Sequence, residues 1–333
     1  MSGTRSNTIG LNEPFLLIPA YQDYLWGGER LKKEYGKKTD CTPLAESWEC
    51  STHPDGPSII GSGAFAGCIL RDVIQDHPEI LGTHPVTKGE LPVLVKLIDA
   101  ARDLSVQVHP DDDYAKRYEN GSLGKSEMWY VLSAEEGARL IYGFTENVTK
   151  EEVREALEDG TILKHLRSVP VHANDVFFIK AGAVHAIGAG IVVAEIQESS
   201  NLTYRIYDYG RTDKDGNPRP LHIAKALDVM DLHSSEEPRQ PIRVLRYRPG
   251  YASELLVRCA WFQTERILLN STAGVDDRTD SSSFEVLLCI EGNGSLKWSR
   301  DEINFEKGNC MFLPADSVPL KLYGKAQLLK VRC

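Results

Sequence analysis

The segment LSVQVHPDDDY, residues 104–114, has the most regular pattern in the chain. In an extended strand alternate side chains share a face, so Ser105, Gln107 and His109 lie on one face and the aliphatic residues that alternate with them lie on the other. The segment is therefore predicted to be a strand with one polar and one apolar face. A surface strand and a strand that lines a small barrel both fit this pattern.

Two further segments supply residue types that bind metals. Glu127 occurs in GKSEMWY, at the start of the next strand-like segment, and His185 occurs in AGAVHAI. With Gln107 and His109 they provide two imidazoles, a carboxylate and an amide oxygen. Such a set suits Zn²⁺, and Mn²⁺, Fe²⁺ or Co²⁺ would also be accommodated. Because the set contains no sulfur and can leave coordination positions open, it favours a catalytic site over a structural one.

A weak internal repeat relates the two halves of the chain. NDVFFIKAGAVHAI (174–187) aligns with GNCMFLPADSVPLK (308–321) at an offset of 134 residues, and YVLSAEEG (130–137) aligns with EVLLCIEG (285–292) at an offset of 155. The difference, 155 − 134 = 21 residues, is about the length of the helical segment near 149–167. This segment is therefore predicted to be an insertion in the first of two similar β units.

Each unit reads as a strand, a tight Glu-Gly turn, a second strand and a further strand, which is typical of a small jelly-roll barrel and resembles the cupin superfamily. The predicted fold is mainly β, with two cupin-like jelly-roll barrels and the helical insertion in the first. The predicted organisation is a disordered tail (1–12), a catalytic domain (13–232), a linker (233–243) and a second domain (244–333).

The same alignment predicts that the second barrel is metal-free. At these offsets Pro319 takes the place of His185, and Ser282 takes the place of Glu127. Proline has no side-chain ligand atom, and a serine hydroxyl is a poor ligand. We therefore expect a single metal ion per chain, in the first barrel.

Composition limits the classes of partner. The chain of 333 residues has 48 acidic and 38 basic residues and a net charge of −10, which argues against binding to nucleic acid or anionic lipid. No apolar run approaches the roughly 18 residues that a spanning helix needs, and the polar start has no signal-peptide pattern. The seven cysteines contain no C-x-x-C motif. We expect a soluble, cytoplasmic protein with reduced thiols and a small-molecule partner; the oligomeric state stays open.

Taken together, LSVQVHPDD, GKSEMWYVL, AGAVHAIGAG, ESWECSTHPDGPS (46–58) and DYLWGG (23–28) resemble the type I phosphomannose isomerase family, in particular its short bacterial form. The resemblance extends from Phe15 onward. It implies an aldose-ketose isomerase that interconverts mannose 6-phosphate and fructose 6-phosphate.

The resemblance also implies roles for individual residues. The family's zinc ligands correspond to Gln107, His109, Glu127 and His185. Through EIQESSNLTYR, Arg205 corresponds to the family's catalytic arginine and Glu195 to an acidic pocket residue. The other positions that correspond to the family's pocket are Glu46, Trp48, Lys96, Ser105 and Lys125. The chain departs from the family at 200–202, just before Arg205, where Ser-Asn-Leu replaces the common Ser-Asp-Asn.

The chemistry of such an isomerase fits these residue types. A proton must move between adjacent carbons through a cis-enediolate, whose negative charge zinc can stabilise. Glu195 and Lys125 are both candidates for the proton shuttle, and the sequence does not choose between them. Arg205 could stabilise the enediolate or bind the phosphate, since its planar guanidinium suits oxyanions. Lys96, Lys125 and Arg205 supply local positive charge for an anionic substrate.

Two alternatives stay open. A cupin-type isomerase or oxygenase could act on a related substrate, in which case bound iron and oxygen-dependent turnover would indicate the oxygenase. A metal-assisted sugar-phosphate sensor would bind without conversion. The presence of Lys125, Glu195 and Arg205 argues against a sensor, because binding alone does not need proton-transfer groups.

Overall fold

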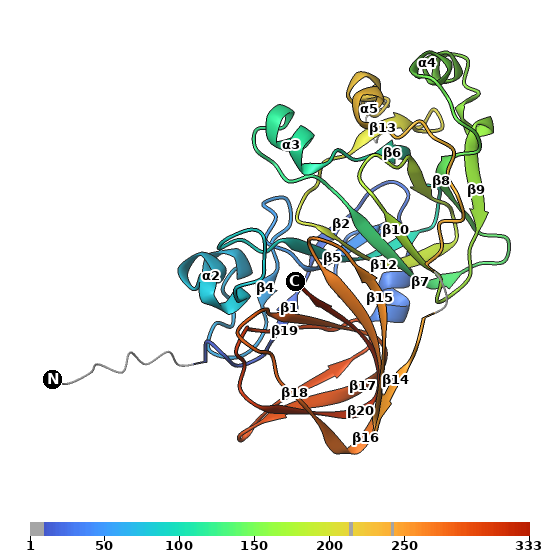
Figure 1. The fold of residues 1–333 in the computed structure, drawn as a ribbon. Coiled ribbons are helices and arrows are strands. Elements are labelled where there is room, and N and C mark those ends of the chain that lie inside the picture. Colours follow the sequence, from blue (N-terminus) through green and yellow to red (C-terminus); the bar gives the residue numbers. More distant parts are fainter. Residues whose placement is uncertain (1–9, 213–215, 241–242) are drawn as a thin grey trace. The chain divides into compact units, whose positions relative to one another are not determined.

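The computed structural model describes residues 10–212, 216–240 and 243–333 (Figure 1). Of the expected disordered tail, only the last three positions lie within the described residues. Of the expected linker, positions 241 and 242 lie outside them.

The described residues form two compact units. The central unit contains residues 21–47 and 94–242, and the terminal unit contains residues up to 20, 48–93 and 243–333. The early segments join the C-terminal strands because β1 (Phe15–Ile18) pairs with β19 (Cys310–Leu313), and β4 (Ile59–Ile60) pairs with β1. The boundaries between these units differ from the expected domain boundaries, and the division into domains 13–232 and 244–333 stays a prediction.

Two sheets build the central unit. The six-stranded sheet has the order β10 (Val176–Ile179), β7 (Glu127–Ala134), β12 (Ile191–Glu198), β5 (Val93–Ala100), β3 (Glu46–Cys50), β2 (Ala20–Gln22). The five-stranded sheet has the order β13 (Tyr204–Tyr207), β6 (Val106–Val108), β11 (His185–Ile187), β8 (Arg139–Phe144), β9 (Leu166–Pro170). Trp129 and Val131 of the first sheet share one buried cluster with Leu140 and Ile187 of the second. The two sheets therefore face each other across a common core, as in a jelly-roll barrel.

Strand β6 has the two-faced character that its sequence predicts. Val106 and Val108 are fully buried in a cluster that also contains residues of α4 (Lys150–Glu158) and α5 (Ile223–Val229). Gln107 projects to the opposite face, and the flanking Ser105 and His109 are buried as well. The polar face of this strand is thus directed into the barrel rather than to the surface.

The helices follow local sequence signals in most places. α4 begins with a capping box formed by Thr149 and Glu152, and with the 3-10 helix η2 (Ile162–Lys164) it lies between β8 and β9, where the insertion was expected. α5 packs against β13 (Figure 1). Residues 70–81 form two separate helices, α2 (Leu70–Asp76) and the 3-10 helix η1 (Pro78–Leu81), because proline interrupts the α-helical hydrogen bonds.

Two short helices were not predicted. α1 (Arg30–Tyr35) ends at Gly36 in a left-handed conformation, and α3 (Asp112–Tyr118) begins with Asp111, whose side chain accepts a hydrogen bond from the Tyr114 N–H. No helix in the described part of the chain has the length and apolar character that a membrane crossing needs.

A long antiparallel sheet builds the terminal unit. Its order is β14 (Arg246–Arg248), β15 (Tyr251–Arg258), β16 (Gln263–Asp277), β20 (Leu320–Arg332), β17 (Glu285–Trp298), β19, β1, β4, and β18 (Asp301–Glu306) pairs with β17. Ile267, Leu287 and Leu328 belong to one buried cluster inside this sheet. Together the two units confirm the predicted mainly-β fold with two cupin-like barrels.

Strand register corrects one part of the predicted repeat. Ile179 lies opposite Glu127, and Leu313 lies opposite Glu285. Since Ile179 and Leu313 are related by the offset of 134, the counterpart of Glu127 is Glu285, and the assignment of Ser282 is wrong.

The cause of this error is that the two matched Glu-Gly pairs are not equivalent. Glu136 and Gly137 form a turn after β7, whereas Glu291 and Gly292 lie within β17. Matching these pairs therefore displaced the alignment of the strands by three residues, from Glu285 to Ser282.

Candidate active site

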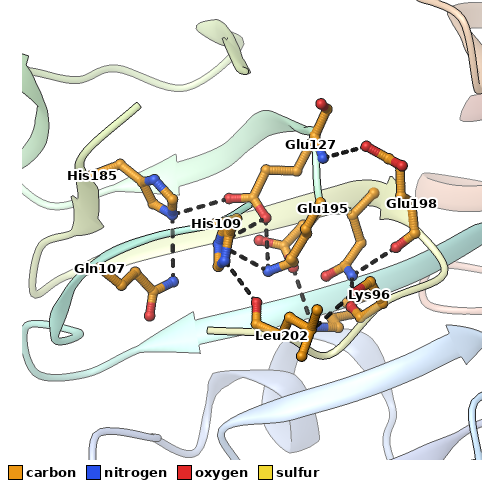
Figure 2. Close-up of polar contacts among 12 residues, drawn as sticks. Lys96, Gln107, His109, Glu127, His185, Glu195, Glu198 and Leu202 are labelled. Carbon is orange, nitrogen blue, oxygen red and sulfur yellow. Dashed lines mark hydrogen bonds and ion pairs between the residues drawn. The ribbon is translucent and has the colours of Figure 1, made fainter. Parts of the chain in front are cut away.

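Three buried side chains converge inside the barrel of the central unit (Figure 2). His109 directly follows β6, Glu127 begins β7, and His185 begins β11. Glu127 Oε2 lies 3.7 Å from His109 Nε2, and Glu127 Oε1 lies 3.4 Å from His185 Nε2. Each side chain is at most 1% exposed. These ligand atoms all lie within 4.8 Å of one another, so one ion could contact all three.

The hydrogen bonds of the imidazoles prepare them for metal binding. His109 Nδ1 lies 2.7 Å from the Leu202 carbonyl oxygen, and His185 Nδ1 lies 2.9 Å from the Ala183 carbonyl oxygen. A carbonyl oxygen only accepts, so both Nδ1 atoms must carry the proton. The unprotonated Nε2 atoms are therefore directed toward Glu127, with lone pairs available to a metal. Burial also lowers the pKa of His185 to about 4 and lowers that of His109, which keeps both rings neutral.

The carboxylate of Glu127 also fits a bound cation. Both of its oxygens are buried, and the ammonium of Lys125 contacts Oε2 at 2.8 Å. Burial, and then the charge of Glu195, raise the pKa of Glu127 to about 7, although nearby Lys125 acts in the opposite direction. A buried carboxylate needs charge compensation, and a metal ion supplies it. The donor set of this cluster therefore fits a divalent cation.

Gln107 and Lys125 adjoin the cluster. Gln107 lies across the strands from both His185 and Arg205, and its Nε2 is 3.4 Å from His185 Nε2. Lys125 Nζ lies 2.8 Å from Glu127 Oε2 and 3.3 Å from His109 Nε2. The amide of Gln107 thus contacts the cluster at His185, and the ammonium of Lys125 contacts it at Glu127 and His109.

A cavity of about 280 Å³ opens beside this cluster. Its lining includes six residues that the sequence analysis singled out, which are Lys96, Ser105, Gln107, Lys125, Glu195 and Arg205. Because Gln107 and Lys125 both line the cavity and contact the cluster, the cavity reaches the candidate metal ligands. Glu46 also lines the cavity, whereas Trp48 is buried and is not among the described lining residues.

Glu195 lies in an ionic network on the floor of the cavity. Its Oε1 is 3.3 Å from Lys96 Nζ, which is also 3.4 Å from Glu46 Oε2. Its Oε2 accepts a hydrogen bond of 2.9 Å from Trp129 Nε1. Although burial raises the pKa of Glu195, the charges of Lys125 and Lys96 outweigh it and hold the pKa below its ordinary value. Glu195 is therefore an ionised carboxylate at neutral pH.

Arg205 is held by neutral partners. Its Nε donates to Ser105 Oγ at 3.1 Å, and its Nη1 donates to the Pro220 carbonyl oxygen at 3.1 Å. By contrast, the neighbouring pocket cation Arg219 is ion-paired with Asp208. The guanidinium of Arg205 is thus fixed in orientation by groups that do not neutralise it, which suits it to an incoming anion.

Trp129 and Arg219 are among the cavity residues to which the sequence reasoning gave no role. Trp129 follows Glu127 by two positions on β7, so strand alternation could have placed it on the same face. No local signal identifies Arg219, which lies in the loop that precedes α5 and reaches the cavity only through the tertiary fold.

Comparison with known proteins agrees with this architecture. Residues 15–137 match the family model of the phosphomannose isomerase type I catalytic domain, and residues 253–333 match that of the mannose-6-phosphate isomerase cupin domain. The mannose-6-phosphate isomerase ManA of Bacillus subtilis (strain 168) is 34% identical over 317 residues, covering 95% of this chain and 98% of that protein. The mannose-6-phosphate isomerase of Streptococcus mutans is 34% identical over 302 residues, covering 91% and 92%.

A solved structure shows the same fold. The crystal structure of the mannose 6-phosphate isomerase from Bacillus subtilis superimposes with a TM-score of 0.88 and 31% sequence identity, covering 96% of this chain and 99% of that one. The chain therefore belongs to the type I phosphomannose isomerase family of enzymes.

Proposed function

We propose that this chain interconverts mannose 6-phosphate and fructose 6-phosphate through a cis-enediolate. The observation that carries the proposal is the cavity beside the cluster of His109, Glu127 and His185. The same cavity is lined by Glu195, an ionised carboxylate, and by Arg205, whose guanidinium hydrogen bonds go to a hydroxyl and a carbonyl oxygen and not to a carboxylate. Such a cavity combines a site for charge stabilisation with a group that can move a proton.

The metal in this proposal is Zn²⁺, one ion per chain, held by Gln107, His109, Glu127 and His185. The neutral Nε2 atoms and the fully buried carboxylate of Glu127 support this ligand set. Bound there, the ion would supply a Lewis acid that polarises substrate oxygens. Mn²⁺, Fe²⁺ and Co²⁺ are the alternatives that the same donors permit.

Glu195 is the proposed proton-accepting group. It is ionised, it is held at both oxygens, and it faces the cavity. Lys125 remains the alternative shuttle, but its ammonium is ion-paired with Glu127 in the structure. If Glu195 abstracts the proton, Glu195→Gln should lower turnover by about 10²–10⁴-fold while substrate binding persists. Lys125→Met should leave more turnover than Glu195→Gln does.

The positive groups of the cavity explain how an anionic substrate binds a chain with a net charge of −10. Lys96 and Lys125 each have a carboxylate neighbour, so much of their charge is balanced locally. Arg205 bonds to a hydroxyl and a carbonyl oxygen instead. We therefore assign contact with the phosphate or the enediolate to Arg205. Ser105 and Lys96 contribute to substrate binding.

A coupled assay tests the proposal. The purified chain is loaded with Zn²⁺ and given mannose 6-phosphate, and the formation of fructose 6-phosphate is followed. We expect turnover that is lost after chelation and restored by Zn²⁺, and no turnover of unphosphorylated mannose. Binding without conversion would indicate a sensor, and turnover that needs oxygen would indicate an oxygenase; either result would contradict the proposal.

A cytoplasmic location is also proposed. All seven cysteines lie within the described residues, and no disulfide joins any of them. This observation is consistent with a reducing compartment. Fractionation of cells that express the chain would test it.

A further inference from the structure

Trp129 lies between the candidate metal ligands and the candidate proton acceptor. It follows Glu127 by two positions on β7, and its neighbour across the strands on β12 is Glu195. Its indole Nε1 donates to Glu195 Oε2 at 2.9 Å, while its ring packs edge-on against His185, with 5.4 Å between centroids and a 72° angle between planes. The side chain is 1% exposed.

We propose that Trp129 is a positioning residue, whose indole N–H fixes the carboxylate of Glu195 in the orientation that proton transfer requires. This inference rests on the proposed function, because it assigns Trp129 a task only if Glu195 moves a proton. The substrate class is the same sugar phosphate.

The two partners of Glu195 differ in what they can fix. Lys96 lies 3.3 Å from Oε1, but its ammonium is shared with Glu46 and can rotate about a flexible chain. Trp129 donates a single directional bond to the other oxygen, and an indole nitrogen is a donor only. Lys96 therefore supplies charge, whereas Trp129 determines the direction of the second oxygen.

The surroundings of Trp129 make this bond rigid. Its ring belongs to the buried cluster that includes Val131, Phe177 and Ile179, so its rotamer is constrained by packing on several sides. A donor held in this way costs little conformational entropy when it binds the carboxylate. A mobile donor at the same distance would orient Glu195 less well.

Two other roles for Trp129 must be separated from this one. The ring lines the cavity, so it could instead stack on the sugar of the substrate. It also touches His185, so it could instead stabilise the metal site. Direct contact with the sugar predicts a change in KM, and support of His185 predicts a loss of bound metal.

The test is Trp129→Phe in the zinc-loaded full chain, with kcat, KM and metal content measured. Loss of one hydrogen bond to a buried charged group should lower kcat by about tenfold or more, with KM changed by less than about threefold and zinc retained. The matched control is Trp298→Phe in the terminal unit, whose Nε1 makes no hydrogen bond in the described structure; it should leave kcat unchanged. An unchanged kcat in Trp129→Phe, a change confined to KM, or a loss of zinc would overturn the inference.

A double-mutant cycle asks whether Trp129 acts through Glu195. In a Glu195→Gln background, Trp129→Phe should lower residual turnover by less than about twofold, since the orientation of a missing base no longer matters. A second fall of about tenfold would show a general structural effect and overturn the inference.

If Trp129→Phe does not fold, 3-benzothienylalanine at position 129 replaces it, because this analogue keeps the shape of indole and lacks only the N–H. The same fall in kcat is expected, and wild-type kinetics would overturn the inference. Wild-type turnover of mannose 6-phosphate is measured first. Its absence would defeat the proposed function, whereas an active wild type with an equally active variant would defeat only this inference.

Discussion

The two units place different charges on the same strand framework. Glu127 in the central unit and Glu285 in the terminal unit occupy equivalent positions in register. On the adjacent strand, Glu195 lies opposite Trp129, whereas the equivalent pair in the terminal unit is Lys330 opposite Leu287. The position that holds the carboxylate of Glu195 in the central unit thus holds the ammonium of Lys330 in the terminal unit.

The exchange changes how each buried glutamate is neutralised. Lys330 Nζ lies 2.9 Å from Glu285 Oε2 and 3.5 Å from Asp277 Oδ2, and Glu285 and Asp277 raise its pKa although burial acts in the opposite direction. In the central unit, Glu127 faces two neutral imidazoles and only one ammonium. Each buried glutamate therefore has one lysine beside it, but Glu127 also faces two neutral imidazoles, which are donors that a metal ion can use.

The largest effect should follow removal of a candidate metal ligand in the central unit. His185→Ala or His109→Ala should lower turnover by more than about a hundredfold and lower bound zinc, since loss of supporting partners alone already costs about 10–100-fold in such sites. Metal analysis and the coupled assay provide the measurements. His172→Ala, at a histidine whose side chain is 78% exposed, should change neither. Undiminished zinc in a variant would remove that histidine from the site.

In the terminal unit, the corresponding change is Lys330→Met. It leaves Glu285 and Asp277 buried without their ammonium, and removal of one partner of a buried ion pair costs about 3–5 kcal/mol of unfolding free energy. Denaturant unfolding measures this loss. The double variant Lys330→Met with Glu285→Gln should recover part of it, because one of the two buried charges is removed. A loss below about 1 kcal/mol would show that Lys330 does not balance Glu285.

The same comparison shows what the sequence could predict. Strand alternation and family motifs identified Gln107, His109, Glu127 and His185, because ligands on one strand face follow a local period. Pairing between strands does not follow such a period. The match between Glu136-Gly137 in a turn and Glu291-Gly292 within β17 misdirected the counterpart of Glu127 from Glu285 to Ser282.

Long-range pairing explains the other differences. Residues 48–93 were expected with the catalytic domain, but β4 joins the terminal unit through β1, which pairs with a strand about 300 residues further along the chain. Trp129 was quoted in a motif but given no role, because its partner Glu195 lies 66 positions away. Such contacts depend on topology, which local patterns do not encode.

A third prediction concerns Arg205 of the central unit. Arg205→Lys keeps the charge but cannot keep both the bond to Ser105 and the bond to the Pro220 carbonyl oxygen. We expect kcat/KM to fall by about a hundredfold, as for a preorganised oxyanion donor. A fall carried by kcat indicates enediolate contact, and a rise in KM alone indicates phosphate contact. The control Arg332→Lys should leave kinetics unchanged, and wild-type kinetics in Arg205→Lys would remove Arg205 from the site.

The smallest expected effect concerns Glu198, at the end of β12 in the central unit. Its counterpart in the terminal unit is Cys333, which directly follows β20. Both groups are held neutral by burial, which raises the pKa of Glu198 to about 8 and that of Cys333 to about 12. Glu198 Oε1 accepts a hydrogen bond from the Ser126 N–H at 2.6 Å, and after burial the charge of Asp112 also raises the pKa of Glu198. Glu198 therefore keeps its proton to a higher pH than an unfolded glutamate does.

The sign of the pH dependence follows from this proton. The folded chain keeps it up to about pH 8, whereas an unfolded glutamate releases it near its ordinary value of 4.5, so the free energy of unfolding should fall as pH rises between these values. Glu198→Gln keeps an acceptor for Ser126 and offers an amide N–H to Asp112 without titrating. We expect it to match the wild type near pH 4 and to be more stable by about 1–3 kcal/mol near pH 8. Denaturant unfolding at both pH values is the measurement, and a stability difference that is the same at both would show that Glu198 is ionised in the folded chain.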